Sequence, residues 1–334
     1  MENGLCHVSR RRCSCEWRPF RRTVKTMKES DLDRWIEKLF QESEENPAEA
    51  ELFDPESYEW PEAGNLPFHY AVRHQKGTAY VRFTPQQGDP FFCIWQPAFD
   101  YPAPLLIHLP GYGAEMSIHP EIMAEGFNIL HINPLGYCTP GGMQPAKSRQ
   151  PDDPLGWPHL QETITSYGEK GYRQWFVNCI QSVAWAAERS EVLPGRFSFF
   201  GTSQGGGAAL ILASMYRDRG VRCAAADVPF LTNYPLAAGR GAYEIAAGAL
   251  EDAQDKERAW KALEYIDTVS HAPRLTFPVL LTAGSDDEMC PPETIEALFA
   301  ELPRTRSLTY IRGREHAYTP EFLFLAKAWF RMYA

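Results

Sequence analysis

The 334-residue chain lacks several features that define whole classes of proteins. No apolar run approaches the roughly 20 residues that a membrane-spanning helix needs, and no internal repeat or low-complexity tract occurs. Basic residues are outnumbered, 33 against 43 acidic residues, which gives a formal net charge of −10. Because nucleic acids and anionic membranes repel an acidic surface, neither is expected as a partner. The composition favours a small, weakly charged substrate.

The eight cysteines show no zinc-ligand spacing. His108, His119 and His131 are spread over the chain without an i, i+4 pair or a neighbouring carboxylate, which disfavours metal-dependent hydrolysis. Most cysteines lie within apolar runs, where they act as small hydrophobic residues in a reducing compartment. The sequence therefore predicts a cytoplasmic protein that needs no metal and no other cofactor.

The first 28 residues differ from the rest in charge. They hold eight Arg and Lys residues against two Glu, without the continuous apolar core of a secretory signal. Residues 1–28 are interpreted as an unstructured extension, or as the product of an upstream start with Met27 as the working initiator, in preference to an Arg-rich presequence. Residues 29–60 are expected to form an amphipathic helix over 31–41 and an acidic connector.

Residues 61–334 are expected to form one α/β domain. Three short runs bounded by Gly and Pro, at 67–73, 77–83 and 91–97, are typical of antiparallel strands at the edge of a sheet. From residue 104 onward, apolar runs alternate with stretches of helix length, which indicates a mostly parallel sheet flanked by helices. The predicted strands of this part are 104–109, 127–132, 196–200, 221–228, 278–284 and 307–313, and the predicted helices are 118–124, one from Gly205, 293–302 and 321–334.

Two insertions interrupt this alternation. Residues 133–172 are rich in Gly, Pro and polar residues, as in a lid or binding loop, and residues 235–270 are typical of two inserted helices. Insertions above the carboxyl ends of parallel strands are where substrate pockets are built. Their aromatic residues are candidates for pocket walls or, where they recur at helical spacing, for the core: Trp157, Tyr167, Tyr172, Trp175, Tyr234 and Tyr243.

The segment Gly201-Thr202-Ser203-Gln204-Gly205 stands between a buried strand and a helix. This is the Gly-x-Ser-x-Gly arrangement of a nucleophile elbow, in which small residues on both sides of the serine let strand and helix approach each other. Attack on an ester carbonyl creates an oxyanion that needs two N–H donors. Gln204 is expected to supply one, and the loop after the strand at 104–109 the other, through Tyr112 or Gly113.

A serine nucleophile needs a base, and the base needs an orienting acid, in the chain order Ser, Asp, His. After Ser203 the histidines are His271 and His316. His316 follows the last predicted strand and is favoured as the base, whereas His271 is interpreted as a surface or capping residue. Asp286 and Asp287 compete for the role of the acid, and the spacing Gly-x-x-Asp-x-x-x-Pro favours Asp287.

Five segments carry a further signal. They are GTSQGGG at 201–207, AADVPFLTNY at 225–234, KALEYIDTVSHAPRLTFPVLL at 261–281, DEMCPPETI at 287–295 and HAYTPEF at 316–322. Together they resemble carbohydrate esterase family 7, the acetyl xylan esterases and cephalosporin C deacetylases. The resemblance implies an α/β-hydrolase fold, a serine esterase for small acyl esters and a homo-oligomer. It also implies Ser203 as nucleophile, Asp287 as acid, His316 as base and Tyr112 as oxyanion donor.

The chain departs from the family pattern at supporting positions. The family's Arg-Gly-Gln segment is Leu135-Gly136-Tyr137 here, the glutamate after the base is replaced by Ala317, and Pro110 stands where the family has histidine. Two alternatives to the esterase stay open. One is a peptidase, amidase or lactone hydrolase with the same triad, and the other is a catalytically silent binding module, which the intact Ser, Asp and His disfavour.

Overall fold

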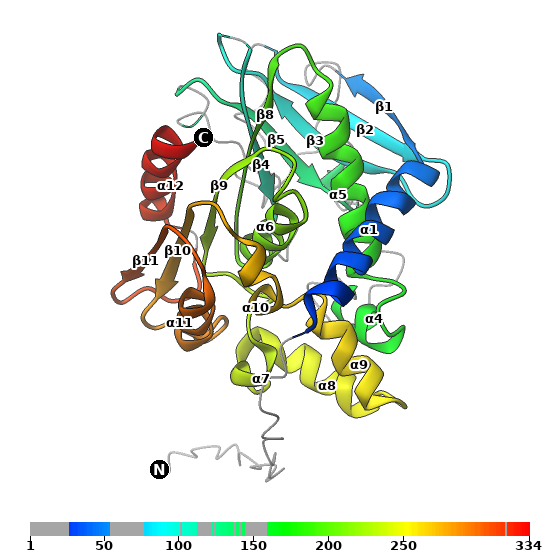
Figure 1. The fold of residues 1–334 in the computed structure, drawn as a ribbon, viewed down its shortest axis with the longest axis vertical. Coiled ribbons are helices and arrows are strands. Elements are labelled where there is room, and N and C mark those ends of the chain that lie inside the picture. The colour runs from blue at the N-terminus through cyan, green and yellow to red at the C-terminus, as the bar shows by residue number, and fades with distance from the viewer. Residues whose placement is uncertain are drawn as a thin grey trace, which may run out of the picture.

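The computed structural model describes residues 27–53, 77–100, 102–111, 122, 125–135, 138–139, 142–143, 159–317 and 319–334. Within this part of the chain, one large sheet has the strand order β1-β2-β3-β5-β4-β8-β9-β10-β11 (Figure 1). Its strands are β1 Ala48–Phe53, β2 Ala79–Pro85, β3 Phe91–Gln96, β4 Ala103–Leu109, β5 Asn128–Asn133, β8 Val192–Thr202, β9 Val221–Asp227, β10 Val279–Gly284 and β11 Arg306–Ile311. A separate small ladder joins β6 Cys138–Thr139 to β7 Gly142–Met143.

The sheet is antiparallel at one end and parallel elsewhere. The pairings from β1 through β2 and β3 to β5 are antiparallel, and those from β5 through β4, β8, β9 and β10 to β11 are parallel. This confirms the predicted mostly parallel sheet with antiparallel strands at its N-terminal edge. The runs at 77–83 and 91–97 form β2 and β3, whereas the run at 67–73 lies outside the described residues.

One edge strand was not predicted. β1 lies within the segment that the sequence favours as an acidic connector. Its residues alternate between Ala and Glu before Leu52 and Phe53, so the apolar face is too weak to give a clear period-2 hydrophobic signal. β1 pairs with β2 along its full length, and this pairing satisfies its backbone hydrogen-bonding groups. The composition of the segment does not predict this pairing.

Helices cover both faces of the sheet. Their bounds are α1 Glu29–Glu45, α4 His159–Thr165, α5 Tyr172–Ala187, α6 Gln204–Met215, α7 Tyr234–Ala237, α8 Glu244–Asp252, α9 Lys256–Glu264, α10 Thr268–His271, α11 Pro292–Glu301 and α12 Pro320–Tyr333, with short 3₁₀ turns at Gly241–Tyr243 and Ala272–Arg274. The predicted helices at 31–41, after Ser203, at 293–302 and at 321–334 correspond to α1, α6, α11 and α12. The helix predicted at 118–124 lies almost wholly outside the described residues.

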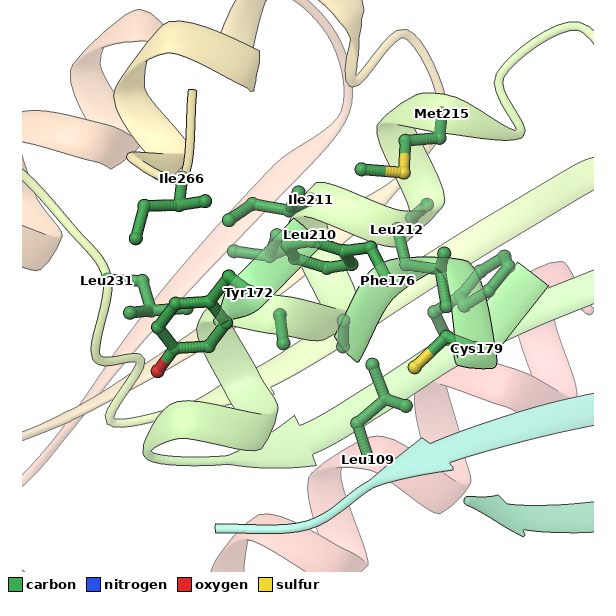
Figure 2. Close-up of a cluster of buried hydrophobic side chains, with 14 of the residues drawn as sticks. Leu109, Tyr172, Phe176, Cys179, Leu210, Ile211, Leu212, Met215, Leu231 and Ile266 are labelled. Carbon is green, nitrogen blue, oxygen red and sulfur yellow. The ribbon is translucent and has the colours of Figure 1, made fainter. Parts of the chain in front are cut away.

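α5 was not predicted, because most of its residues are buried and it carries no narrow apolar stripe. It packs beside α1 (Figure 1). Figure 2 shows Tyr172, Phe176 and Cys179 of α5 against Leu210 and Leu212 of α6, within the larger of two apolar clusters. A second cluster on the opposite face joins Phe200 of β8 to residues of α12. The central strands β4, β5 and β10 are therefore buried on both faces, as their continuous apolar sequences predict.

The strand order has a topological switch point at β4, which lies between the parallel strands β5 and β8. From β4 the chain moves outward to β5 on one side, and later returns through α4 and α5 to β8 on the other side of β4. The loops after β4 and β8 therefore leave the same edge of the sheet and lead to opposite sides of it. In open α/β sheets, a ligand crevice forms at such a place. The inserted helices α8 and α9 contact α4.

Two buried histidines make the stability of the protein depend on pH. His271, predicted as a surface or capping residue, is instead fully buried at the end of α10, with Ser214 Oγ 2.6 Å from its Nδ1 and the Tyr265 carbonyl 2.9 Å from its Nε2. Burial lowers the pKa of His271 to about 4 and that of His159 likewise to about 4. An unfolded histidine titrates near pH 6.5, so the unfolded state binds protons that the folded state excludes between roughly pH 6.5 and 4.

We therefore expect the free energy of unfolding to fall as the pH drops from about 6.5 to 4, with each histidine contributing up to about 1.4 kcal/mol per pH unit. Urea titrations at several pH values measure this slope. His271→Gln cannot take up the proton, and is expected to flatten the slope by one histidine while lowering stability at neutral pH. An unchanged slope in His271→Gln would contradict the assignment to this residue.

Two further findings concern the whole described chain. None of the helices in the described ranges is long and apolar enough to cross a membrane. Cys93, Cys179, Cys223 and Cys290 are buried and free, as expected for cysteines that serve as small hydrophobic residues.

Candidate active site

Ser203 occupies a sharp turn between strand and helix. β8 ends at Thr202 and α6 begins at Gln204, and Ser203 between them has φ 56° and ψ −122°. This left-handed conformation costs energy for a residue with a side chain, so the surroundings must hold it. The N–H of Ser203 donates to the Asp227 carbonyl at 2.8 Å, and the Ser203 carbonyl accepts from Phe230 N–H at 2.9 Å.

Glycines make the turn possible. A Cβ atom on Gly205 would lie 2.0 Å from the Leu109 carbonyl oxygen, and one on Gly201 would lie 2.5 Å from the Gly205 carbonyl carbon. A Cβ on Gly207 would lie 1.8 Å from the Phe230 carbonyl oxygen. These obstacles are backbone atoms of β4, α6 and the loop after β9, so they cannot rotate away. The elbow therefore requires glycine, which has no Cβ atom, at these three positions.

The structure brings Ser203, His316 and Asp287 into one hydrogen-bonded chain. His316 Nε2 lies 3.0 Å from Ser203 Oγ, although the two residues are 113 positions apart. His316 Nδ1 lies 2.8 Å from Asp287 Oδ2. The Asp287 side chain is fully buried, and its other carboxylate oxygen accepts the N–H groups of Met289 at 2.9 Å and Cys290 at 2.8 Å. These bonds orient Asp287, which in turn orients the imidazole.

The rejected candidates have other partners. Asp286 is exposed and accepts a hydrogen bond from the neighbouring Ser285 hydroxyl. His271 is held by Ser214 and Tyr265 in the core, as described above. Asp287, which the loop spacing favours over Asp286, is the residue that bonds His316 in the structure.

Cys290 is an additional neighbour of the nucleophile that the sequence did not single out. Burial and the charge of Asp287 raise the pKa of its thiol, and a hydrogen bond with Ser203 acts in the opposite direction. The thiol is therefore neutral at physiological pH. A neutral buried thiol is a poor nucleophile, so it does not compete with Ser203.

Gln204 connects the elbow to two other segments. Its Oε1 is 2.7 Å from the Tyr172 hydroxyl, which donates to it, and 2.5 Å from His159 Nε2. Its Nε2 donates to the Gly111 carbonyl at 3.3 Å. The side chain thereby joins the start of α6 to α4, to α5 and to the loop after β4. Tyr112, the second predicted oxyanion donor, lies outside the described residues.

Replacing Gln204 by Met keeps the size of the side chain and removes the acceptor that Tyr172 and His159 share. We expect a loss of about 1–3 kcal/mol of stability and roughly tenfold lower kcat, because the N–H of residue 204 would lose its fixed direction. Thermal unfolding and ester hydrolysis measure the two effects. Tyr172→Phe removes one of the two donors and is the matched control, with a smaller expected loss in both.

The predicted pocket residues divide between core and undescribed segments. Tyr172, Trp175, Tyr234 and Tyr243 are buried in the core cluster, and Tyr167 is partly buried against it. Trp157, Gly136 and Tyr137 lie outside the described residues. The core interpretation of these aromatics therefore holds for the members that the structure describes.

The described ranges contain no group of three or more His, Cys, Asp or Glu residues that could hold a metal ion. His108 and His131 contact each other through their Nδ1 atoms at 2.5 Å, on the adjacent strands β4 and β5. His119 lies outside the described residues.

Two residues near the triad escaped sequence reasoning. Asp227 at the end of β9 and Arg314 in the loop after β11 form a buried ion pair. Ala317 replaces the glutamate that the family resemblance implies after the base, and its backbone carbonyl accepts the Nε–H of Arg314 at 3.0 Å. No sequence motif links residues 227 and 314, which are 87 positions apart.

The chain is similar to known acetyl xylan esterases in sequence and in fold. A family model described as acetyl xylan esterase (AXE1) matches residues 23–332. Acetyl xylan esterase 1 from Thermoanaerobacterium sp. JW/SL YS485 is 21% identical, with a TM-score of 0.71, and the match covers 90% of this chain and 92% of that protein. Acetyl xylan esterase from Paenibacillus sp. R4 is 20% identical, with a TM-score of 0.72, over 93% of this chain and 96% of its own.

A more distant likeness connects the fold to peptidases. Acylaminoacyl peptidase from Pyrococcus horikoshii is 12% identical, with a TM-score of 0.55, over 76% of this chain and 40% of that protein. At these identities the solved structures establish a shared α/β-hydrolase fold, while the match to the family model extends over nearly the whole sequence.

Proposed function

Since the chain belongs to the acetyl xylan esterase family, we propose that it hydrolyses acetyl and other small acyl esters with Ser203 as nucleophile, His316 as base and Asp287 as orienting acid. The observation that carries this assignment is the hydrogen-bonded chain from Asp287 through His316 to Ser203 at the elbow. Membership of the family makes the protein a carboxylic ester hydrolase, and the assignment of roles to the three residues is our inference.

The geometry suggests the following sequence of steps. His316 Nε2 accepts the proton of Ser203 as Oγ attacks the ester carbonyl, and returns it to the departing alcohol. A bond between Oγ and the acyl carbon replaces the bond to the alcohol oxygen. Water then attacks the acyl-enzyme, His316 again takes and returns a proton, and the carboxylic acid leaves. Asp287 keeps Nε2 directed at Ser203 through its bond to Nδ1.

The oxyanion is proposed to bind at the start of α6. The backbone N–H of Gln204 belongs to the first turn of this helix, where unpaired N–H groups and the helix dipole favour negative charge. Tyr112 is proposed as the second donor, from the loop after β4. Hydrogen bonds to an oxyanion of this kind contribute about 3–4 kcal/mol each to the transition state.

The substrate is proposed to be a small-molecule ester, because the net charge of −10 disfavours nucleic acid as a partner. We propose a cytoplasmic location, supported by the four described cysteines that are free and buried. Homo-oligomeric assembly and a single domain over residues 61–334 stay predictions, which size-exclusion chromatography with light scattering and limited proteolysis test.

The proposed function is tested by hydrolysis of p-nitrophenyl esters from acetate to octanoate, together with labelling by a serine-reactive fluorophosphonate. We expect turnover to be fastest with acetate and the label to map to Ser203. Hydrolysis of p-nitroanilides in place of esters would favour the peptidase or amidase alternative. Absence of both turnover and labelling would contradict the proposal and favour a silent binding module.

A further inference from the structure

A buried ion pair joins the loops that carry the triad. Arg314 Nη1 and Nη2 donate to the two carboxylate oxygens of Asp227, at 2.7 and 2.8 Å. The side chains of Arg314 and Asp227 are 3% and 1% exposed. A bidentate contact of this kind fixes both the distance and the orientation of its partners.

Asp227 connects three neighbouring strand ends. Its carboxylate also accepts hydrogen bonds from Thr202 Oγ1 at 3.1 Å and from Thr282 Oγ1. Thr202 directly precedes Ser203 at the end of β8, and Thr282 belongs to β10, whose following loop carries Asp287. The backbone carbonyl of Asp227 accepts the N–H of Ser203 at 2.8 Å. This one residue therefore fixes the nucleophile relative to the strands on both sides of β9.

Arg314 holds the loop of the base. Its Nε and Nη2 both donate to the carbonyl of Ala317. The guanidinium therefore joins the two ends of the segment 314–317, which contains His316. The backbone carbonyl of Arg314 accepts the N–H of Asp286 at 3.0 Å, next to Asp287. The pair thus reaches all three triad residues, through the backbone of Ser203, the neighbour of Asp287 and the loop of His316.

We propose that the Asp227–Arg314 pair is a positioning device for the triad, which keeps His316 in register with Ser203 and Asp287 and neutralises a second buried carboxylate near the base. The inference rests on the proposed function and adds two residues to it. Replacing a buried ion pair by apolar residues often leaves stability unchanged or improves it, so stability by itself is a weak reason for a pair at this place.

The test compares Arg314→Gln, Asp227→Asn and the double variant with the wild type. In both single variants we expect kcat for p-nitrophenyl acetate to fall by roughly 10- to 100-fold, because small displacements of reacting groups have effects of this size. KM is expected to change by less than about threefold. Should Arg314→Gln not fold, Asp227→Asn tests the same expectation by itself.

The comparison of kcat with KM separates positioning from a merely structural role, because partial unfolding lowers kcat only in proportion to the folded fraction, which the melting curve measures. The double variant is expected to keep the loss of kcat, because it still lacks the bidentate contact. NMR chemical shifts of the His316 ring protons at one fixed pH are expected to differ from those of the wild type in both single variants, so the inference is tested even if the wild type hydrolyses none of the esters.

Arg274→Gln is the matched control. Arg274 is a buried arginine whose partner, Asp33, lies in α1, and it does not contact the triad residues. This variant is expected to lower the melting temperature and to keep the wild-type kcat in the folded protein. The inference is overturned if the folded Asp227 and Arg314 variants keep the wild-type kcat and the wild-type chemical shifts of the His316 ring protons. Wild-type turnover distinguishes that result from a failure of the proposed function.

Discussion

Replacing Ser203 by alanine is expected to lower kcat for p-nitrophenyl acetate by roughly 10⁶-fold, the order of the loss found when a triad serine is removed. The hydroxyl is the group that forms the bond to the acyl carbon, and the nearby Cys290 thiol is buried and neutral. The elbow tolerates a methyl group at this position, since a serine Cβ is already there. The variant is therefore expected to fold normally and to keep the melting temperature of the wild type to within a few degrees.

Single-turnover and steady-state rates, corrected for hydrolysis in buffer, measure this loss. Ser190→Ala is the matched control, because Ser190 is exposed and its hydroxyl contacts only the neighbouring Glu191 among the hydrogen bonds described for it. It is expected to keep wild-type activity. Retention of more than about a hundredth of the wild-type kcat in folded Ser203→Ala would exclude Ser203 as the nucleophile.

Replacing Gly205 by alanine is expected to destabilise the protein by about 3 kcal/mol or more. The new Cβ would lie 2.0 Å from the Leu109 carbonyl oxygen and 2.7 Å from the Pro110 carbonyl oxygen. Both are backbone atoms at the end of β4, so either β4 or the first turn of α6 must move. Such a movement would also displace the N–H of Gln204 and the loop that leads to Tyr112, and we expect kcat to fall by at least about 100-fold in the protein that still folds.

The matched control is Gly248→Ala in α8, where the added Cβ would have no heavy atom within 4 Å other than those of its chain neighbours and its own helix backbone. In the interior of a helix this change is expected to stabilise the protein by roughly 0.5–1 kcal/mol. Urea unfolding of the two variants therefore gives opposite signs for the same chemical substitution. Equal stability of Gly205→Ala and the wild type would contradict the close approach of α6 to β4.

Some of the site followed from local patterns. The order strand, Gly-x-Ser-x-Gly, helix specified Ser203, because the steric needs of an elbow restrict the residues two positions away. The loop spacing after β10 and the place of His316 after β11 specified the other two candidates, because the carboxyl ends of parallel strands meet at one edge of a sheet. β1 and α5 escaped prediction since the former is only weakly apolar and the latter is buried on most sides.

Other features had no local signature. His271 and His316 both follow short polar segments, and only packing shows that the first is enclosed beside Ser214 and the second is partly exposed beside Ser203. Gln204 of α6 contacts Tyr172 of α5 and His159 of α4. Both partners lie within residues 133–172, which the sequence predicts to be a lid or binding loop.

The sequence by itself determined the alternation of strands and helices, the elbow and the identity of the three triad candidates, because these depend on residue type and on spacing along the chain. Only the tertiary structure decided that Asp227 meets Arg314, 87 positions away, and that Gly207 faces the Phe230 carbonyl. Such contacts depend on how strands are ordered and how closely helices pack on them. Long-range packing of this kind leaves no periodic trace in the sequence.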